Sequence, residues 1–279
     1  MDKSINEFIR SAKEEGLTEV TINKYVSDIK QFHKFIKLKL DKNFKELSQE
    51  EVKEQLESYI KSLEKRQYKP STINGKIVII NKYLKVLGIE CIHKYLKVQK
   101  KIYVENVLTE GEYKRIIEQC NNKRDELIIQ MLVNTGVRVS ELLSLTIQDI
   151  NRKEIYIKGK GSKYREIIIS PQLRQKIREY IKEYRLDTDK EKLFTGKRGA
   201  LKRDAVNKML LKYAKKAHVR KEKAHPHSCR HLFGKRLADK GISLDIIQTC
   251  LGHESIATTA IYTKRSKEEL ERTLENNFI

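Results

Sequence analysis

Cysteines are few and widely spaced in this sequence of 279 residues. No C-x-x-C pair occurs, which argues against a structural zinc site or a disulfide framework and favours a reducing cytoplasm. Long apolar runs are absent as well, and the N-terminal MDKSINEFIR carries charges where a signal peptide would have an apolar core. We therefore expect a soluble, unexported protein that is long enough to bury a core without covalent cross-links. The cysteines are Cys91, Cys120, Cys229 and Cys250.

Acidic residues are also few relative to basic ones. Asp and Glu number 38 against 59 Lys and Arg, which gives a formal net charge of +21. An excess of this size indicates a polyanionic partner, either nucleic acid or an anionic membrane surface. Residues 61 to 101 hold 11 basic side chains against 2 acidic ones, so this stretch is a candidate DNA-facing surface. The structural alternative for any one lysine cluster is a solvated helix face.

The hydrophobic pattern predicts a small helical domain over residues 1–98. Apolar residues recur at helical spacing in four segments, with a break at Gly16 and an end at Gly88. Ser48 and Glu51 form a capping-box pattern at the start of the third segment. Residues 94–107 show no sustained helical period, and within them residues 99–107 are predicted to be a linker, followed by a second domain at 108–279. No catalytic constellation occurs in the first domain.

The second domain is predicted to be helical with one small antiparallel sheet, which makes the whole chain mainly α (α+β). Thr109 and Glu112 form another capping-box pattern, and Gly136 is expected to end a helix in a left-handed conformation. Residues 154–158 and 164–170 flank a glycine turn and predict a β-hairpin with Lys160 at its tip. Helices are predicted at 173–184, 204–217, 227–240, 244–251 and 268–277.

Six basic and nucleophilic residues follow in order along this second domain. Two separated arginines suit two oxygens of one phosphate, because a guanidinium donates in a planar fork and keeps its charge. A tyrosine is a suitable hydroxyl for an attack that leaves the enzyme attached to its substrate, provided that cations surround it. The pattern therefore predicts a phosphate clamp with a nucleophile. The six are Arg138, Lys160, His227, Arg230, His253 and Tyr262.

Two other kinds of site are disfavoured. His225, His227 and His231 have a spacing that does not place three side chains on one helical face, and no carboxylate cluster lies nearby, so a metal site is not expected. The Gly159-Lys160-Gly161 segment lacks the spacing of a Walker loop, which argues against nucleotide hydrolysis. No cofactor is predicted.

The motifs resemble those of the tyrosine recombinase/integrase family, and the layout is most similar to Xer-type and small transposon- or phage-encoded recombinases. They are an arginine box, TGVRVSEL; an H-x-x-R box, His227 to Arg230; and an LGH box followed by Tyr262. The resemblance covers nearly the whole chain, and its helical N-terminal half is similar to the family's core-binding domain.

The resemblance implies a role for each motif residue. Tyr262 would attack the scissile phosphate, leaving a 3′-phosphotyrosine and a free 5′-hydroxyl, while Arg138 and Arg230 hold the phosphate oxygens. Lys160 would be the general acid for the leaving oxygen. The remaining roles fall to His227, which would assist proton transfer from the tyrosine, His253, which would hydrogen-bond a phosphate oxygen, and Glu141, which would support the arginine box.

The same resemblance implies partners. These are double-stranded DNA recombination sites and a synaptic homotetramer, or a heterotetramer with a paired recombinase, with accessory proteins and no membrane, in a bacterial cytoplasm near the nucleoid. Leu270, Leu274 and Phe278 repeat every four residues in the last predicted helix, which would pack on a neighbouring protomer. A type IB topoisomerase-like relaxase and a non-catalytic DNA-binding regulator are the competing hypotheses. Integration, excision and resolution would use the same residues.

Overall fold

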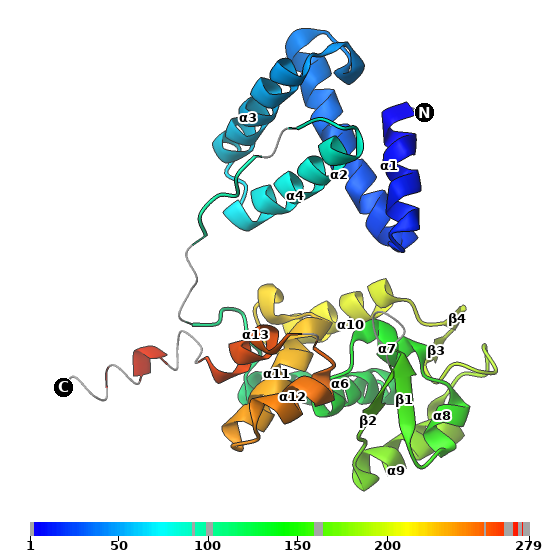
Figure 1. Cartoon of the computed structure of the whole chain (residues 1–279). Helices are drawn as coiled ribbons and strands as arrows, with labels where there is room; N and C mark the ends of the chain where they lie inside the picture. The colour runs from blue at the N-terminus through cyan, green and yellow to red at the C-terminus, as the bar shows by residue number, and fades with distance from the viewer. Residues whose placement is uncertain are drawn as a thin grey trace. The chain divides into compact units, whose positions relative to one another are not determined.

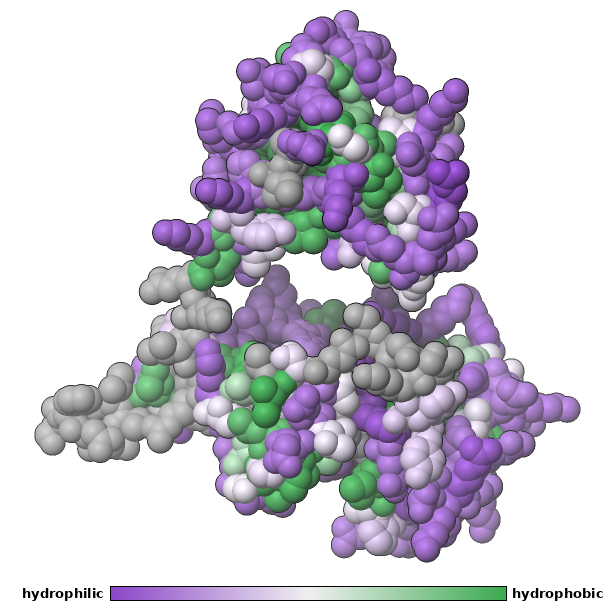
Figure 2. Space-filling model, viewed as in Figure 1, coloured by the Kyte–Doolittle hydropathy of each residue, from purple (hydrophilic) through white to green (hydrophobic). Residues whose placement is uncertain are grey.

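Two hydrophobic cores divide the chain, one for each half of the sequence. The computed structural model describes residues 3–90, 93–98, 103–158, 164–253, 255–264, 270–272 and 275. Its contacts separate into two compact units, Met1–Lys100 and Lys101–Ile279 (Figure 1). Hydrophilic residues cover most of the visible face of each unit, as the high share of charged side chains requires (Figure 2). Among the described residues, no helix is long and apolar enough to cross a membrane.

The N-terminal unit contains the four predicted helices. They are α1 (Lys3–Glu14), α2 (Glu19–Leu40), α3 (Gln49–Lys65) and α4 (Pro70–Val86), with a short 3-10 turn, η1 (Phe44–Glu46), before α3. The capping box predicted for α3 is present, because Ser48 accepts from the backbone of Glu51 and Glu51 accepts from the backbone of Ser48. Phe8, Phe32 and Tyr83 are fully buried among the helices and give this unit an aromatic core.

The C-terminal unit is built around α6, which is buried along nearly its whole length. Ile128, Ile129, Met131, Leu132 and Val133 are all inaccessible to solvent. The motif-bearing helix α11 packs against α6. The helical elements are α5 (Glu110–Glu118), α6 (Lys123–Thr135), α7 (Val139–Ser144), α8 (Ile147–Asn151), α9 (Pro171–Glu179), the π-helical turn η3 (Tyr180–Tyr184), α10 (Arg203–Lys216), η4 (Lys221–Lys223), α11 (Pro226–Asp239), α12 (Leu244–Leu251), α13 (Ile256–Thr259) and η5 (Ala260–Thr263).

The predicted β-hairpin is present as the strands β1 (Ile155–Lys158) and β2 (Tyr164–Ile167). They pair antiparallel, with Ile155 opposite Ile167 and Lys158 opposite Tyr164. The second strand ends at Ile167, three residues earlier than predicted, before the cap Ser170 of α9. The turn at 159–163, which includes Lys160, lies outside the described residues.

Three features of this unit differ from the prediction or escape it. A second hairpin, β3 (Thr195–Gly196) and β4 (Gly199–Ala200), was not predicted, because strands of two residues carry no alternation. The helix predicted at 173–184 ends in the π-helical turn η3 rather than in regular helix. Of the helix predicted at 268–277, residues 270–272 and 275 are helical, and the rest, including Leu274, lie outside the described residues, as does Phe278.

Candidate active site

The arginine box is formed where α6 ends and α7 begins. Gly136 ends α6 with a φ of +63°, as predicted, and a Cβ at this position would lie 2.3 Å from the Phe233 ring, so a larger residue does not fit. Arg138 then takes the N-cap position of α7 in extended conformation. Its backbone nitrogen donates to Glu141 Oε2 at 2.6 Å and its Nη1 donates to Oε1 at 2.8 Å. The side chain of Arg138 remains 42% exposed.

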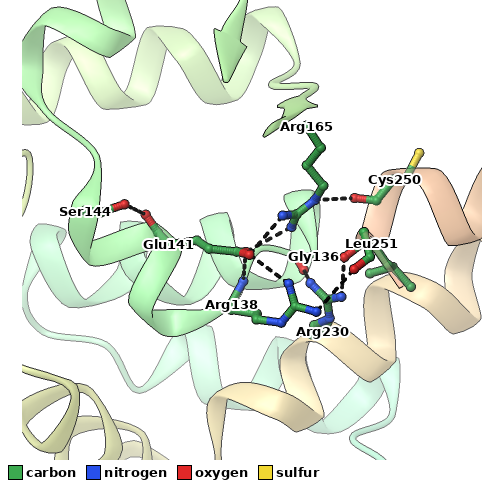
Figure 3. Close-up of polar contacts among 9 residues, drawn as sticks. Gly136, Arg138, Glu141, Ser144, Arg165, Arg230, Cys250 and Leu251 are labelled. Carbon is green, nitrogen blue, oxygen red and sulfur yellow. Dashed lines mark hydrogen bonds and ion pairs between the residues drawn. The ribbon is translucent and has the colours of Figure 1, made fainter. Parts of the chain in front are cut away.

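Arg230 lies beside Arg138 but is 2% exposed. Its Nη1 donates to the Gly136 carbonyl at 2.7 Å, and its Nη2 donates to the carbonyl of Leu251. Burial, together with the charge of Arg138, lowers the pKa of Arg230 to about 10, so it stays charged at neutral pH. The two guanidiniums lie next to one another in Figure 3 although they come from different elements, the start of α7 and the middle of α11.

Glu141 connects this pair to a third arginine, which the sequence analysis did not select. Arg165 of β2 donates from Nη1 and Nη2 to the two carboxylate oxygens of Glu141, each at 2.9 Å. Burial alone would raise the pKa of Glu141, but the hydrogen bonds from Arg165 and Arg138 outweigh burial and hold this pKa at about 2. Arg165 lies just after the predicted hairpin tip, two residues before the buried Ile167, so the two side chains are on the same face of the strand. This alternation was the sequence signal that could have identified Arg165 as an inward-facing arginine.

Tyr262 lies on η5 with its ring against α11, and the residue is 4% exposed. The ring packs where α11 has a glycine: a Cβ on Gly234 would lie 2.7 Å from two ring carbons of Tyr262. Burial raises the pKa of the Tyr262 phenol above its ordinary value, and the guanidiniums of Arg230 and Arg138 act in the opposite direction. The phenol is therefore held in a site where positive charge favours its ionised form.

His253 also packs against this tyrosine. The two rings stack with centroids 5.9 Å apart and planes inclined by 10°. His253 Nδ1 lies 3.0 Å from the hydroxyl of Thr259, and the His253 carbonyl accepts from Gln248 Nε2 at 3.0 Å. Burial and the charges of Arg230 and Arg138 lower the pKa of His253 to about 4, so the imidazole is neutral at physiological pH.

Three histidines in and beside the H-x-x-R box, His225, His227 and His231, form a series of rings that leads toward Tyr262. His225 is the N-cap of α11 and so lies outside the helix, whereas His227 and His231 are four residues apart on one helix face. Ring centroids are 6.4 Å apart for His225 and His227, 4.8 Å for His227 and His231, and 5.0 Å for His231 and Tyr262. Partial burial of the ring, and after it the charge of Arg230, lower the pKa of His227 below its ordinary value.

Within the part of the chain that the structure describes, no group of three or more His, Cys, Asp or Glu residues could hold a metal ion. The charged groups that converge here are instead guanidiniums, with one carboxylate among them. Such a set can bind a phosphodiester through N–H donors and can stabilise a phenolate next to it. The structure brings together five of the six predicted site residues, with Glu141, and the sixth, Lys160, lies outside the described residues.

Comparison with known proteins identifies the family. Residues 106–269, which include every predicted site residue, match the model of the phage integrase family. The chain belongs to this family. Tyrosine recombinase XerA of Pyrococcus horikoshii is 30% identical over 97% of this chain and 92% of its own. Phage integrases of this tyrosine recombinase class are enzymes that break and rejoin DNA.

Two solved structures extend the comparison to three dimensions. The crystal structure of a XerA recombinase is 26% identical, with a TM-score of 0.54 over 99% of this chain and 98% of the other. The XerH site-specific recombinase, solved as a post-cleavage complex with a palindromic difH substrate, is 24% identical. Its TM-score is 0.68 over 92% of this chain and 79% of the other, which shows a shared fold.

Proposed function

We propose that this protein is a site-specific DNA recombinase in which Tyr262 is the nucleophile. The phenolic oxygen attacks the scissile phosphate, a bond forms between that oxygen and phosphorus, and the 5′ oxygen of the next nucleotide leaves. The products are a 3′-phosphotyrosine and a free 5′-hydroxyl, and the reverse reaction with a different 5′-hydroxyl exchanges strands. The observation that carries the proposal is the buried Tyr262 phenol beside the guanidiniums of Arg138 and Arg230.

The other site residues bind the phosphate, stabilise its developing charge and transfer protons. Arg138 and Arg230 hold the non-bridging phosphate oxygens and stabilise the charge that develops on them. His227, neutral because burial lowers its pKa, takes the phenolic proton. Lys160 delivers a proton to the leaving 5′ oxygen, and His253 donates to a phosphate oxygen. Since the phosphotyrosine conserves the energy of the phosphodiester, rejoining needs no nucleotide cofactor.

We assign double-stranded DNA recombination sites as the substrate. Support comes from the net charge of +21, from the basic residues of 61–101, and from the XerH relative, which was solved on its difH substrate. The N-terminal domain, 1–98, would bind the DNA together with the catalytic domain, 108–279, across the linker 99–107. Four protomers on two synapsed sites would exchange strands through a Holliday junction, in the cytoplasm, for integration, excision or resolution.

A nicked suicide duplex pool tests the proposal. A nick close to the cleavage site lets the short product diffuse away, so cleaved DNA stays attached to the protein. Incubation in EDTA followed by a denaturing gel should show a covalent adduct for the wild type and none for Tyr262→Phe. The matched control is Tyr184→Phe, at a tyrosine that is 47% exposed, which should form the adduct normally. Sequencing of the trapped DNA should yield one recurrent site.

Three results would contradict the proposal. An adduct that persists in Tyr262→Phe would place the nucleophile elsewhere. Tight, salt-sensitive DNA binding by a wild type that forms no adduct, even with a candidate partner recombinase added, would support the regulator hypothesis instead. Trapping at arbitrary sequences, with relaxation of supercoiled plasmid by monomers, would support a topoisomerase.

A further inference from the structure

Arg165 connects three segments that are far apart in the sequence, namely β2, α7 and the end of α12. Its side chain is 11% exposed and reaches from β2 to the carboxylate of Glu141 in α7, with both hydrogen bonds at 2.9 Å (Figure 3). Its Nε donates to the carbonyl of Cys250, near the end of α12, at 3.2 Å. The guanidinium thus uses both of its donating edges on protein groups, which leaves it poorly suited to grip a ligand itself.

The position of Arg138 depends on the same groups. Glu141 fixes both the backbone nitrogen and Nη1 of Arg138, and Arg138 Nη2 donates to the carbonyl of Gly252 at 3.3 Å. Arg165 packs against Gly252, where a Cβ would lie 2.8 Å from Arg165 Cδ. Arg138 and Arg165 are therefore coupled twice, through Glu141 and through the turn that follows α12.

The charges of this cluster also make Arg138 depend on Arg165. An isolated Arg138–Glu141 pair would be neutral, and its carboxylate would compete with a phosphate for the guanidinium. With Arg165 as a second partner of Glu141, the group of three carries one net positive charge. Glu141 can then stay ionised while the exposed side of Arg138 is available to an anion.

We propose that Arg165 is a positioning residue, which orients Arg138 for the scissile phosphate by fixing Glu141 and offsetting its charge. The inference rests on the proposed function. Arg165 does not touch the substrate in this account, and its effect passes through Glu141 to Arg138.

Single-turnover cleavage of the nicked suicide duplex measures this role. Arg165→Met should lower the cleavage rate about 100-fold, the loss typical of a disturbed charge-stabilising group. Arg165→Lys, which keeps the charge but not the fork, should lose about 10-fold. The double variant Arg165→Met/Glu141→Gln removes one charge of each sign and should cleave faster than Arg165→Met.

A second substrate separates positioning from a general loss of structure. A duplex with a neutral methylphosphonate at the scissile position lacks the charge that Arg138 neutralises. The deficit of Arg165→Met should therefore be much smaller on the methylphosphonate than on the phosphate, whereas loss of structure would slow both substrates equally. The matched control is Arg174→Met, because Arg174 also donates to backbone carbonyls, those of Ile150, Arg152 and Lys153, away from the site.

The outcomes are distinct. Equal deficits on both substrates, or cleavage by Arg165→Met at the wild-type rate, would overturn the inference while leaving the proposed function intact. A wild type that forms no Tyr262 adduct would overturn the proposed function itself. If thermal unfolding shows that Arg165→Met does not fold, Arg165→Lys is compared with the wild type instead. Its cleavage rate must then be lowered on the phosphate substrate and lowered less on the methylphosphonate.

Discussion

Gly234 of α11 makes room for the nucleophile, and adding one methyl group there should slow cleavage while the fold stays intact. A Cβ at this position would lie 2.7, 2.7 and 2.9 Å from three ring carbons of Tyr262. Contacts this short do not persist, and because α11 packs on the buried helix α6, the ring on η5 must yield. We expect the phenol to move by about 1 Å, enough to slow an aligned reaction about 100-fold.

The stability of Gly234→Ala should change much less than its activity. Over-packing costs about 1–3 kcal/mol, and replacing a glycine inside a helix with alanine returns about 1 kcal/mol. The net destabilisation should therefore lie between about 0 and 2 kcal/mol, which chemical unfolding can measure. Gly111→Ala in α5 is the matched control, because its Cβ would meet only Arg115 Nη1 at 3.8 Å.

The assay is the single-turnover rate of covalent adduct formation on the nicked duplex, with DNA affinity measured in parallel. Gly234→Ala should bind DNA as the wild type does and form adduct about 100-fold more slowly. Gly111→Ala should match the wild type in both measurements. Adduct formation by Gly234→Ala at the wild-type rate would refute the placement of the Tyr262 ring against α11.

Three further predictions concern protonation and backbone geometry. Because burial and Arg230 lower the pKa of His227 from 6.5, the cleavage rate should stay level from pH 8 to 6.5 and fall only at lower pH; a fall that begins near pH 8 would contradict its role as proton acceptor. Gly252→Ala combines a φ of +62° with a contact 2.8 Å from Arg165 Cδ, so it should lose about 1–3 kcal/mol of stability and most activity, which unfolding and adduct assays would show. The pKa of Glu141 is lowered from 4.5 to about 2, so its ionised form stabilises the fold above pH 4.5. On the order of 3 kcal/mol of the free energy of unfolding should be lost as the pH falls from 4.5 to 2, and Glu141→Gln should lack this pH dependence in unfolding experiments.

The local signals in the sequence determined most of the fold. Capping boxes such as Ser48 with Glu51, and the left-handed glycine Gly136, act within one turn of helix, so a reader of the sequence can place those helix ends. The hairpin β3–β4 is different, since strands of two residues carry no alternation that a pattern could show. Just before it, Leu193 N donates to Leu145 O, a bond between distant segments that no local pattern encodes.

The residues of the candidate site likewise divide into those that a local motif identifies and those that only the folded chain brings together. Motif order selected Arg138, Arg230 and Tyr262 because each motif is read within a few residues. Arg165 was missed because its importance comes from Glu141, which lies 24 residues away, and from the end of α12, 85 residues away. The adjacency of His227 and His231 was recoverable from their four-residue spacing, but the T-shaped packing of His231 on Tyr262 was not.

The most direct test of the account is to locate the DNA on the trapped protein. Trypsin should release the peptide 241–264, in which Tyr262 is the one tyrosine among the 13 of the chain. Mass spectrometry of the wild-type adduct should find a nucleotide phosphate on this peptide, and the released DNA end should be a 5′-hydroxyl that a kinase can label. A nucleotide on any other peptide, or a 5′-phosphate linked to the protein, would contradict the assignment of Tyr262 as the nucleophile that forms a 3′-phosphotyrosine.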